Sequence, residues 1–151
     1  MLSISEKALK MPASPIRKLV PFADAAKKRG TKVYHLNIGQ PDIESPKEAL
    51  DAIKNNTLKL VEYPHSAGIL SFRQGLAKYY QNIGIDVNEN EINITNGGSE
   101  ALQIAIAVTC NPDEEILVME PFYTNYNTFA LQNDVILKPI STDIKNGFAL
   151  P

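Results

Sequence analysis

The second half of the chain alternates between two hydrophobic patterns, and this alternation constrains the fold more than any other feature of the sequence. Polar and apolar side chains alternate over residues 91–95 and predict a strand, whereas residues 97–110 are apolar on nearly every side and predict a helix. A short apolar run at residues 115–119 predicts a strand covered on both faces. A helix over 122–132 and a strand over 134–140 follow. Strands and helices in this order form a parallel sheet, so the sequence predicts an α/β fold.

The first half is predicted to consist mainly of helices that begin near serine and proline residues. Ser14 and Ser45 each precede a proline, which is favoured at the first position of a helix, and Pro21 should kink or restart the first of these helices. A short helical turn is expected at Ser3, and Asn146-Gly147 favours a hairpin turn between two short strands. The other expected elements are helices over residues 15–29, 46–56 and 69–82, a strand over 31–38 and an irregular stretch over 60–68.

The composition of the 151 residues is that of an ordinary globular domain, with 44% hydrophobic and 21% charged side chains, which excludes disordered and collagen-like chains. The 15 basic and 17 acidic residues leave a net charge of −2, so no basic field favours nucleic acid or an anionic membrane. A lone cysteine, Cys110, suits a reducing compartment. The first residues do not resemble a signal peptide, and no apolar run approaches the roughly 20 residues of a membrane helix. We therefore expect a cytoplasmic protein that binds neither nucleic acid nor membrane.

The segment Ile94–Leu102 is the most informative for chemistry, because a predicted strand ends there, two glycines follow and a helix begins. The first amides of a helix lack partners inside the helix and carry partial positive charge, so they bind anions. Gly97 and Gly98 would let a ligand approach the backbone, and the Ser99 hydroxyl could add a contact. This pattern predicts a phosphate site. The alternative is a plain strand-to-helix turn in which Asn96 or Ser99 only caps the helix.

Three further segments contain candidate binding residues, each with a simpler structural alternative. Tyr123 follows a predicted strand at its carboxyl end, where ligands of α/β sheets gather, so its ring could stack on a planar cofactor or could belong to the core. Gly39 would allow a carboxylate to reach a backbone amide or would only close a turn. Tyr63 lies in a stretch predicted to be irregular and could be a plain surface or interface residue.

The sequence provides no arrangement typical of a metal site or a nucleophilic triad. His35 and His65 are far apart along the chain, and Cys110 lies in an apolar predicted helix, so no metal-ligand cluster is expected. No G-x-S-x-G motif is present, which argues against a serine hydrolase of the α/β type. Neither a dinucleotide-binding G-x-G-x-x-G motif nor a Walker loop occurs.

Taken in order and at their spacings, these segments resemble the N-terminal portion of a class I/II aminotransferase, a fold type I enzyme that depends on pyridoxal 5′-phosphate. Each motif is weak by itself, and the ordered set is specific. Two positions depart from the pattern of many relatives, because Gln40 stands in place of Glu and Ile43 in place of Phe. The matching segments are residues 14–16, 36–46, 63–73, 95–102 and 112–126.

The resemblance implies a role for each candidate residue. The amides of Gly98 and Ser99, with the Ser99 hydroxyl, would hold the cofactor phosphate, and Gly97 would shape the turn. Tyr123 occupies the position of the aromatic residue that stacks on the pyridine ring. Tyr63 would reach across the interface of a homodimer to the phosphate bound by the partner. The remaining two candidates, Ile38 and Gly39, would line the pocket for the substrate carboxylate.

The resemblance also implies an incomplete enzyme. Residues 1–45 would form the N-terminal arm and part of a small domain, and residues 46–151 would form the first part of a three-layer, parallel-sheet large domain. The lysine that forms the Schiff base with the cofactor would lie beyond Pro151. We therefore expect transamination between an amino acid and a 2-oxo acid from the parent enzyme, and no catalysis from these residues alone.

Two other functions remain as alternatives. A free-standing α/β module that binds phosphate or a nucleotide without catalysis would use the same glycine turn, although it would not need the long segment before Glu91. A regulator with an aminotransferase-like domain would be expected to carry a basic helix-turn-helix upstream, and the chain starts directly with the arm.

Overall fold

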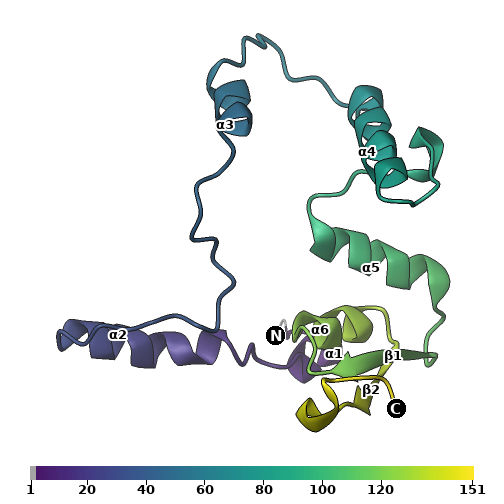
Figure 1. Cartoon of the computed structure of the whole chain (residues 1–151). Helices are drawn as coiled ribbons and strands as arrows, with labels where there is room; N and C mark the ends of the chain where they lie inside the picture. The colour runs from purple at the N-terminus through teal and green to yellow at the C-terminus, as the bar shows by residue number, and fades with distance from the viewer. Residues whose placement is uncertain (1–2) are drawn as a thin grey trace. The chain divides into compact units, whose positions relative to one another are not determined.

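The computed structural model describes residues 3–151, which divide into two compact units (Figure 1). The unit that we call the sheet unit combines the described residues up to Gly39 with Ser99–Pro151. The unit that we call the helical unit consists of Gln40–Gly98.

The sheet unit contains two parallel strands joined by a helix. Strand β1 (Glu115–Glu120) pairs with strand β2 (Ile136–Ser141), in a register that places Glu115 opposite Ile136 and Glu120 opposite Ser141. Helix α6 (Asn125–Gln132) connects the two strands and packs against β2 (Figure 1). Helix α5 (Gly98–Thr109) precedes β1. This helix–strand–helix–strand order confirms the α/β fold that the hydrophobic patterns predict.

A small core lies where α6 turns into β2. Phe129 and Ala130 on α6 are buried together with Val135, which immediately precedes β2. The turn is closed by backbone hydrogen bonds, because the Val135 amide donates to the Ala130 carbonyl over 2.9 Å. Asp134 adopts a left-handed conformation, with φ of 57°, that allows the chain to reverse at this point. These contacts fix α6 against the strand that follows it.

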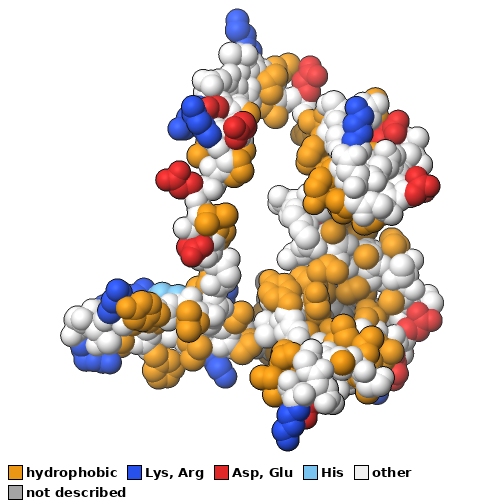
Figure 2. All heavy atoms as spheres, viewed as in Figure 1, with side chains coloured by type: hydrophobic (Ala, Val, Ile, Leu, Met, Phe, Trp, Pro, Cys, Tyr) orange, Lys and Arg blue, Asp and Glu red, His pale blue; other side chains and the backbone are white. Residues whose placement is uncertain are grey.

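Much of the apolar surface of the sheet unit faces solvent. No residue of α5 is buried, although most of its side chains are apolar. On β1, Leu117 and Met119 are exposed on one side of the strand. Figure 2 shows hydrophobic side chains gathered over α5 and α6. Packing within the described residues therefore stabilises the region around α6 far more than it stabilises α5.

The N-terminal segment of the sheet unit contains helix α1 (Glu6–Lys10), the short 3₁₀ turn η1 (Arg17–Leu19) and helix α2 (Val20–Lys28). Ser5, and not Ser3 as predicted, caps α1, because its Oγ accepts a hydrogen bond of 3.1 Å from the Ala8 amide. The expected restart at Pro21 is confirmed, since α2 begins after η1 with proline in its first turn.

The helical unit contains α3 (Lys47–Lys54), α4 (Leu70–Asn82) and the 3₁₀ turn η2 (Glu89–Glu91). Arg73 is the buried charged residue of this unit, and its guanidinium group donates to the carbonyls of Gly68 and Glu89. Gly68 has φ of +98°, and a Cβ atom built on it would overlap the side chain of Ile94. These contacts join the loop before α4 to the segment that leads toward α5.

Two predicted strands and one predicted hairpin do not form. Residues 31–38 and 91–95 carry no strand pairing, because the sheet of the described chain consists of β1 and β2 alone and an isolated strand leaves its backbone groups without partners. At Asn146-Gly147 the chain forms a 3₁₀ turn, η3 (Ile144–Asn146), because the Asp143 side chain accepts from the Lys145 amide over 2.9 Å. Among the helices of residues 3–151, none has the length and apolar character to cross a lipid bilayer.

Candidate functional site

The predicted phosphate site is a glycine turn followed by a three-turn helix. Gly97 has φ of +88°, a conformation that favours glycine, and its carbonyl accepts a hydrogen bond of 3.0 Å from the Thr95 hydroxyl. Helix α5 begins at the next residue, Gly98. A Cβ atom built on either glycine would meet nothing within 4 Å. The turn is therefore open to a group that approaches the start of α5.

The chemistry of this turn fits a phosphate group. The first amides of a helix have no partner within the helix and lie at the positive end of its dipole. Ser99 follows as the second residue of α5 and is exposed, so its hydroxyl is accessible to the same ligand. Backbone amides and a hydroxyl form the donor set that an anion requires. The structure thus places Gly97, Gly98 and Ser99 together at a helix start, as predicted.

Tyr123 lies in the loop that follows β1, at the carboxyl end of the strand. Its hydroxyl accepts a hydrogen bond of 2.6 Å from the side-chain amide of Asn125. The ring of Tyr126 contacts the Tyr123 ring edge-on, with centroids 5.8 Å apart and planes at 86°. Tyr123 nevertheless remains 49% exposed. Its ring is therefore held on its hydroxyl and on one side while much of its surface stays free for a ligand.

A cavity of about 400 Å³ joins this aromatic residue to the predicted carboxylate pocket. Ile38 and Gly39 line the cavity from the segment after α2, and Tyr123 and Asn125 line it from the segment after β1. Its volume lies within the range of small-molecule sites, roughly 300–1,000 Å³. Three of the seven predicted site residues, Ile38, Gly39 and Tyr123, are thus brought together, although they come from distant parts of the sequence.

The other predicted residues do not line this cavity. Gly97, Gly98 and Ser99 form the turn described above and are not among the residues that line the cavity. Tyr63 belongs to the helical unit, where it is fully exposed in an irregular stretch.

Several polar residues of the cavity escaped prediction. Arg17 and Asn37 line it together with Asn125, and Ser14, predicted only as a helix cap, also belongs to its wall. The capping prediction itself is supported, because the Ser14 hydroxyl accepts from the Arg17 amide over 3.3 Å. No local signal marks Arg17, which lies within the helix that the sequence predicts over residues 15–29. Arg17 can be assigned to the cavity only from the structure, which brings the loop after β1 beside it.

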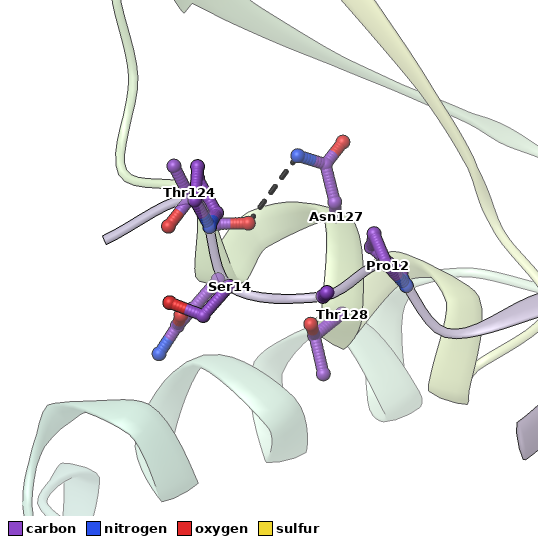
Figure 3. A pocket seen from close by; sticks show the side chains of 8 residues that line it. Pro12, Ser14, Thr124, Asn127 and Thr128 are labelled. Atoms are coloured by element: carbon purple, nitrogen blue, oxygen red, sulfur yellow. Dashed lines mark hydrogen bonds between the residues drawn. The ribbon is translucent and has the colours of Figure 1, made fainter. Parts of the chain in front are cut away.

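A second, smaller cavity of about 260 Å³ shows how the N-terminal segment contacts α6 (Figure 3). Pro12 and Ser14 line it opposite Thr124, Asn127 and Thr128 at the start of α6. The Asn127 side-chain amide donates to the Thr124 carbonyl over 3.2 Å, as the dashed line in Figure 3 marks. The segment before η1 therefore lies against the beginning of α6, which places Arg17 near the loop that carries Tyr123.

Comparison with known proteins identifies the family to which the chain belongs. The family described as Aminotransferase class I and II matches residues 31–150. A (5-formylfuran-3-yl)methyl phosphate transaminase from Methanocaldococcus jannaschii is 30% identical over 128 residues, which cover 83% of this chain and 35% of that protein. An aspartate aminotransferase from Thermotoga maritima is 28% identical over 125 residues, which cover 82% of this chain and 33% of that protein. The chain thus spans about a third of the length of these relatives.

Solved structures show the same fold over almost the whole chain. An aspartate aminotransferase from Thermotoga maritima superimposes with a TM-score of 0.87 at 25% identity, over 98% of this chain and 40% of that one. An alanine aminotransferase from Pyrococcus furiosus gives a TM-score of 0.84 at 28% identity, over 97% and 38% of the two chains. The predicted partial fold type I architecture is therefore confirmed. The family match, the shared fold and the order of the motifs together establish that the chain belongs to the class I and II aminotransferase family.

Proposed function

We propose that the protein carrying this chain is a pyridoxal-phosphate-dependent aminotransferase that transfers an amino group between an amino acid and a 2-oxo acid. The single observation that carries the proposal is the cavity in which Ile38 and Gly39 meet Tyr123. In the family these positions correspond to a carboxylate pocket and to a ring-stacking residue. Membership of the family supports the same assignment.

The residues of this chain would hold the cofactor at two points. The amides of Gly98 and Ser99, with the Ser99 hydroxyl, would bind the phosphate, and Gly97 would keep the turn open. Each charge-assisted hydrogen bond of this kind contributes about 1.5–3 kcal/mol. Tyr123 would support the pyridine ring, and Asn125 would fix the tyrosine through its hydroxyl. When bound, pyridoxal phosphate supplies an electron sink for charge that develops at the α-carbon of an amino acid.

Substrate binding would use the other wall of the cavity. Gly39 has no side chain and open space around it, so a carboxylate could approach the backbone amides there. Ile38 lines the same wall and would exclude water from one side of the substrate. The residues of this chain would thus bind and orient the substrate and the cofactor.

The proposal includes the assembly and the domain division expected from the family. A second copy of the whole protein would place its Tyr63 at the phosphate held by Gly98 and Ser99, which accounts for a tyrosine that is fully exposed here. Residues 1–45 would belong to the arm and small domain, and residues 46–151 to the first part of the large domain.

The test uses the protein in full, as its gene encodes it. Purified protein is mixed with pyridoxal phosphate and then with a panel of amino acids and a 2-oxo acid, and transfer of the amino group is followed by chromatography. We expect tight cofactor binding and transfer from at least one amino acid. Stabilisation by nucleotides but not by pyridoxal phosphate, measured as the melting temperature, would instead identify a phosphate- or nucleotide-binding module without catalysis.

A further inference from the structure

The hydroxyl of Thr95 donates a hydrogen bond of 3.0 Å to the carbonyl of Gly97, two residues later in the chain. This bond lies directly before α5, whose first residue is Gly98. Gly97 has no side chain, and nothing lies within 4 Å of the position that a Cβ atom would occupy. The hydrogen bond from Thr95 thus restrains a carbonyl that the conformational freedom of glycine would otherwise leave variable.

The direction of this carbonyl also sets the direction of the Gly98 amide. The Gly97 carbonyl and the Gly98 N–H belong to one peptide unit, which is planar and trans, so the two groups point in opposite directions. Because the oxygen is drawn toward the Thr95 hydroxyl, the N–H points away from Thr95. Gly98 is the first residue of α5, and its amide is one of the donors that have no acceptor within the helix. Thr95 therefore orients a donor of the phosphate turn.

The backbone next to Thr95 is tied to the loop that precedes α4. The Ile94 amide donates to the Ala67 carbonyl over 3.0 Å. The Ile94 side chain also lies against Gly68, where a Cβ atom would overlap it. Thr95 is half-buried and β-branched, and few rotamers are open to such a side chain, which lowers the entropic cost of holding its hydroxyl on the carbonyl. The hydroxyl thus acts from an anchored segment of the helical unit.

We propose that Thr95 is a positioning residue for the phosphate of pyridoxal phosphate, because its hydroxyl holds the peptide unit between Gly97 and Gly98 with the N–H presented to the anion. The inference rests on the proposed function, which assigns the Gly98 amide to that phosphate. Thr95 acts through this peptide unit and does not itself bind the cofactor. Without the hydroxyl, rotation of the peptide unit would turn the Gly97 carbonyl oxygen toward the anion and replace an attraction by a repulsion.

The experiment removes the hydroxyl and compares ligands with and without a phosphate group. The full protein is titrated with pyridoxal phosphate, with pyridoxal and with inorganic phosphate, and phosphorus NMR records the chemical shift of the bound phosphate. Thr95→Val and Thr95→Ala lack the hydroxyl, the first with the branched shape retained, and Thr95→Ser keeps the hydroxyl. Thr109→Val is the matched control, because the Thr109 hydroxyl donates to the Ala105 carbonyl over 2.7 Å near the other end of α5.

We expect Thr95→Val to bind pyridoxal phosphate about threefold to tenfold more weakly, the effect of one lost hydrogen bond, and to bind pyridoxal as well as the wild type does. Its phosphorus signal should move from the wild-type position. Thr95→Ser should restore both the affinity and the signal, and Thr109→Val should match the wild type.

Three results would overturn the inference. The first is an unchanged affinity for pyridoxal phosphate in the hydroxyl-free variants, or an equal weakening for pyridoxal. The second is a loss that persists in Thr95→Ser, because the hydroxyl would then not be responsible. The third is failure of both Thr95→Val and Thr95→Ala to fold, seen by circular dichroism, which would assign Thr95 to the fold alone.

The proposed function is judged separately, on the wild-type protein. Failure of the wild type to bind pyridoxal phosphate would refute the proposed function, whereas binding of inorganic phosphate that Thr95→Val weakens and Thr95→Ser restores would still establish that Thr95 orients an anion-binding turn. If the wild type and Thr95→Val bind pyridoxal phosphate equally well, the aminotransferase assignment stands and the role of Thr95 is refuted.

Discussion

The side-chain amide of Asn125 donates a hydrogen bond of 2.6 Å to the phenol oxygen of Tyr123, two residues earlier in the chain. The ring of Tyr126, the second residue of α6, contacts the ring of the same tyrosine edge-on. Because the first residue of α6 holds the tyrosine hydroxyl, the orientation of the ring is coupled to the start of that helix. The loop after β1 thus presents a partly exposed aromatic ring in a fixed position.

Substitution Asn125→Ala should therefore weaken cofactor binding without unfolding the protein. The tyrosine ring remains but loses a partner that orients it, and a single hydrogen bond of this kind contributes about 0.5–1.5 kcal/mol. We expect the dissociation constant for pyridoxal phosphate, measured by absorbance titration, to rise by about twofold to tenfold. Asn127→Ala is the matched control, since Asn127 lies on the same helix and donates to Thr124 instead. An equal effect in both variants would assign the loss to the helix start and not to Tyr123.

The hydroxyl of Ser99 should contribute to the affinity for the phosphate group specifically. Ser99→Ala removes one donor at the start of α5, and we expect pyridoxal phosphate to bind about tenfold more weakly. Pyridoxal, which lacks the phosphate, should bind the variant and the wild type equally well. Ser71→Ala, at an exposed position of α4, serves as the control. If the variant bound pyridoxal more weakly by the same factor, Ser99 would contact another part of the cofactor or have a structural role.

The elements that the sequence predicts well are those whose pattern is decided locally. Helix α5 and strand β1 follow from continuous apolar runs, and α4 follows from a stripe of apolar residues that ends before Gly84. The strands expected over 31–38 and 91–95 fail for a non-local reason, because a strand exists only where a neighbour supplies hydrogen bonds. Leu36, in the first of these segments, is 95% exposed. Alternation of residue types gives no information about that neighbour.

Some residues of the candidate site can also be predicted from local sequence, whereas others depend on contacts between distant segments. The glycine turn at Gly97 is visible in the sequence because its φ of +88° requires a residue that tolerates it. Arg17 and Asn125 could not be predicted as neighbours, because their proximity depends on how the segment before η1 packs against α6. That packing is a property of three-dimensional contacts, and the local pattern around Arg17 is that of a solvated helix face.

Two glycines of the helical unit should respond in opposite directions to the same substitution. Gly68→Ala places a Cβ atom against Ile94 in a left-handed backbone conformation, and we expect a loss of about 1–3 kcal/mol in the free energy of unfolding. Gly75→Ala lies within α4 in open space, and we expect a gain of about 0.5–1 kcal/mol from helix propensity. Denaturant unfolding followed by circular dichroism measures both. Similar losses for the two variants would contradict the predicted contact between Gly68 and Ile94.

The turn before β1 should make stability depend on pH through Glu114. The backbone amide of Asn111 donates to Glu114 over 2.7 Å and its side-chain amide over 3.2 Å, and these bonds lower the pKa of the Glu114 carboxyl. Because its folded pKa lies below its unfolded pKa, the contribution to stability is present above the unfolded pKa, about 4.3, and is lost as the pH falls through the folded pKa.

We therefore expect Glu114→Gln to lower the free energy of unfolding near neutral pH and to reduce the stability that the wild type loses on acidification. The measurement is urea unfolding at a series of values between about pH 6 and about pH 3, a window that spans the unfolded pKa. Glu62→Gln is the control, because Glu62 is exposed and belongs to no ion pair within residues 3–151. The prediction fails if the free energies of unfolding of the wild type and Glu114→Gln differ by the same amount at every pH in this range. The hydrogen bonds from Asn111 would then stabilise the charged and the neutral carboxyl group equally.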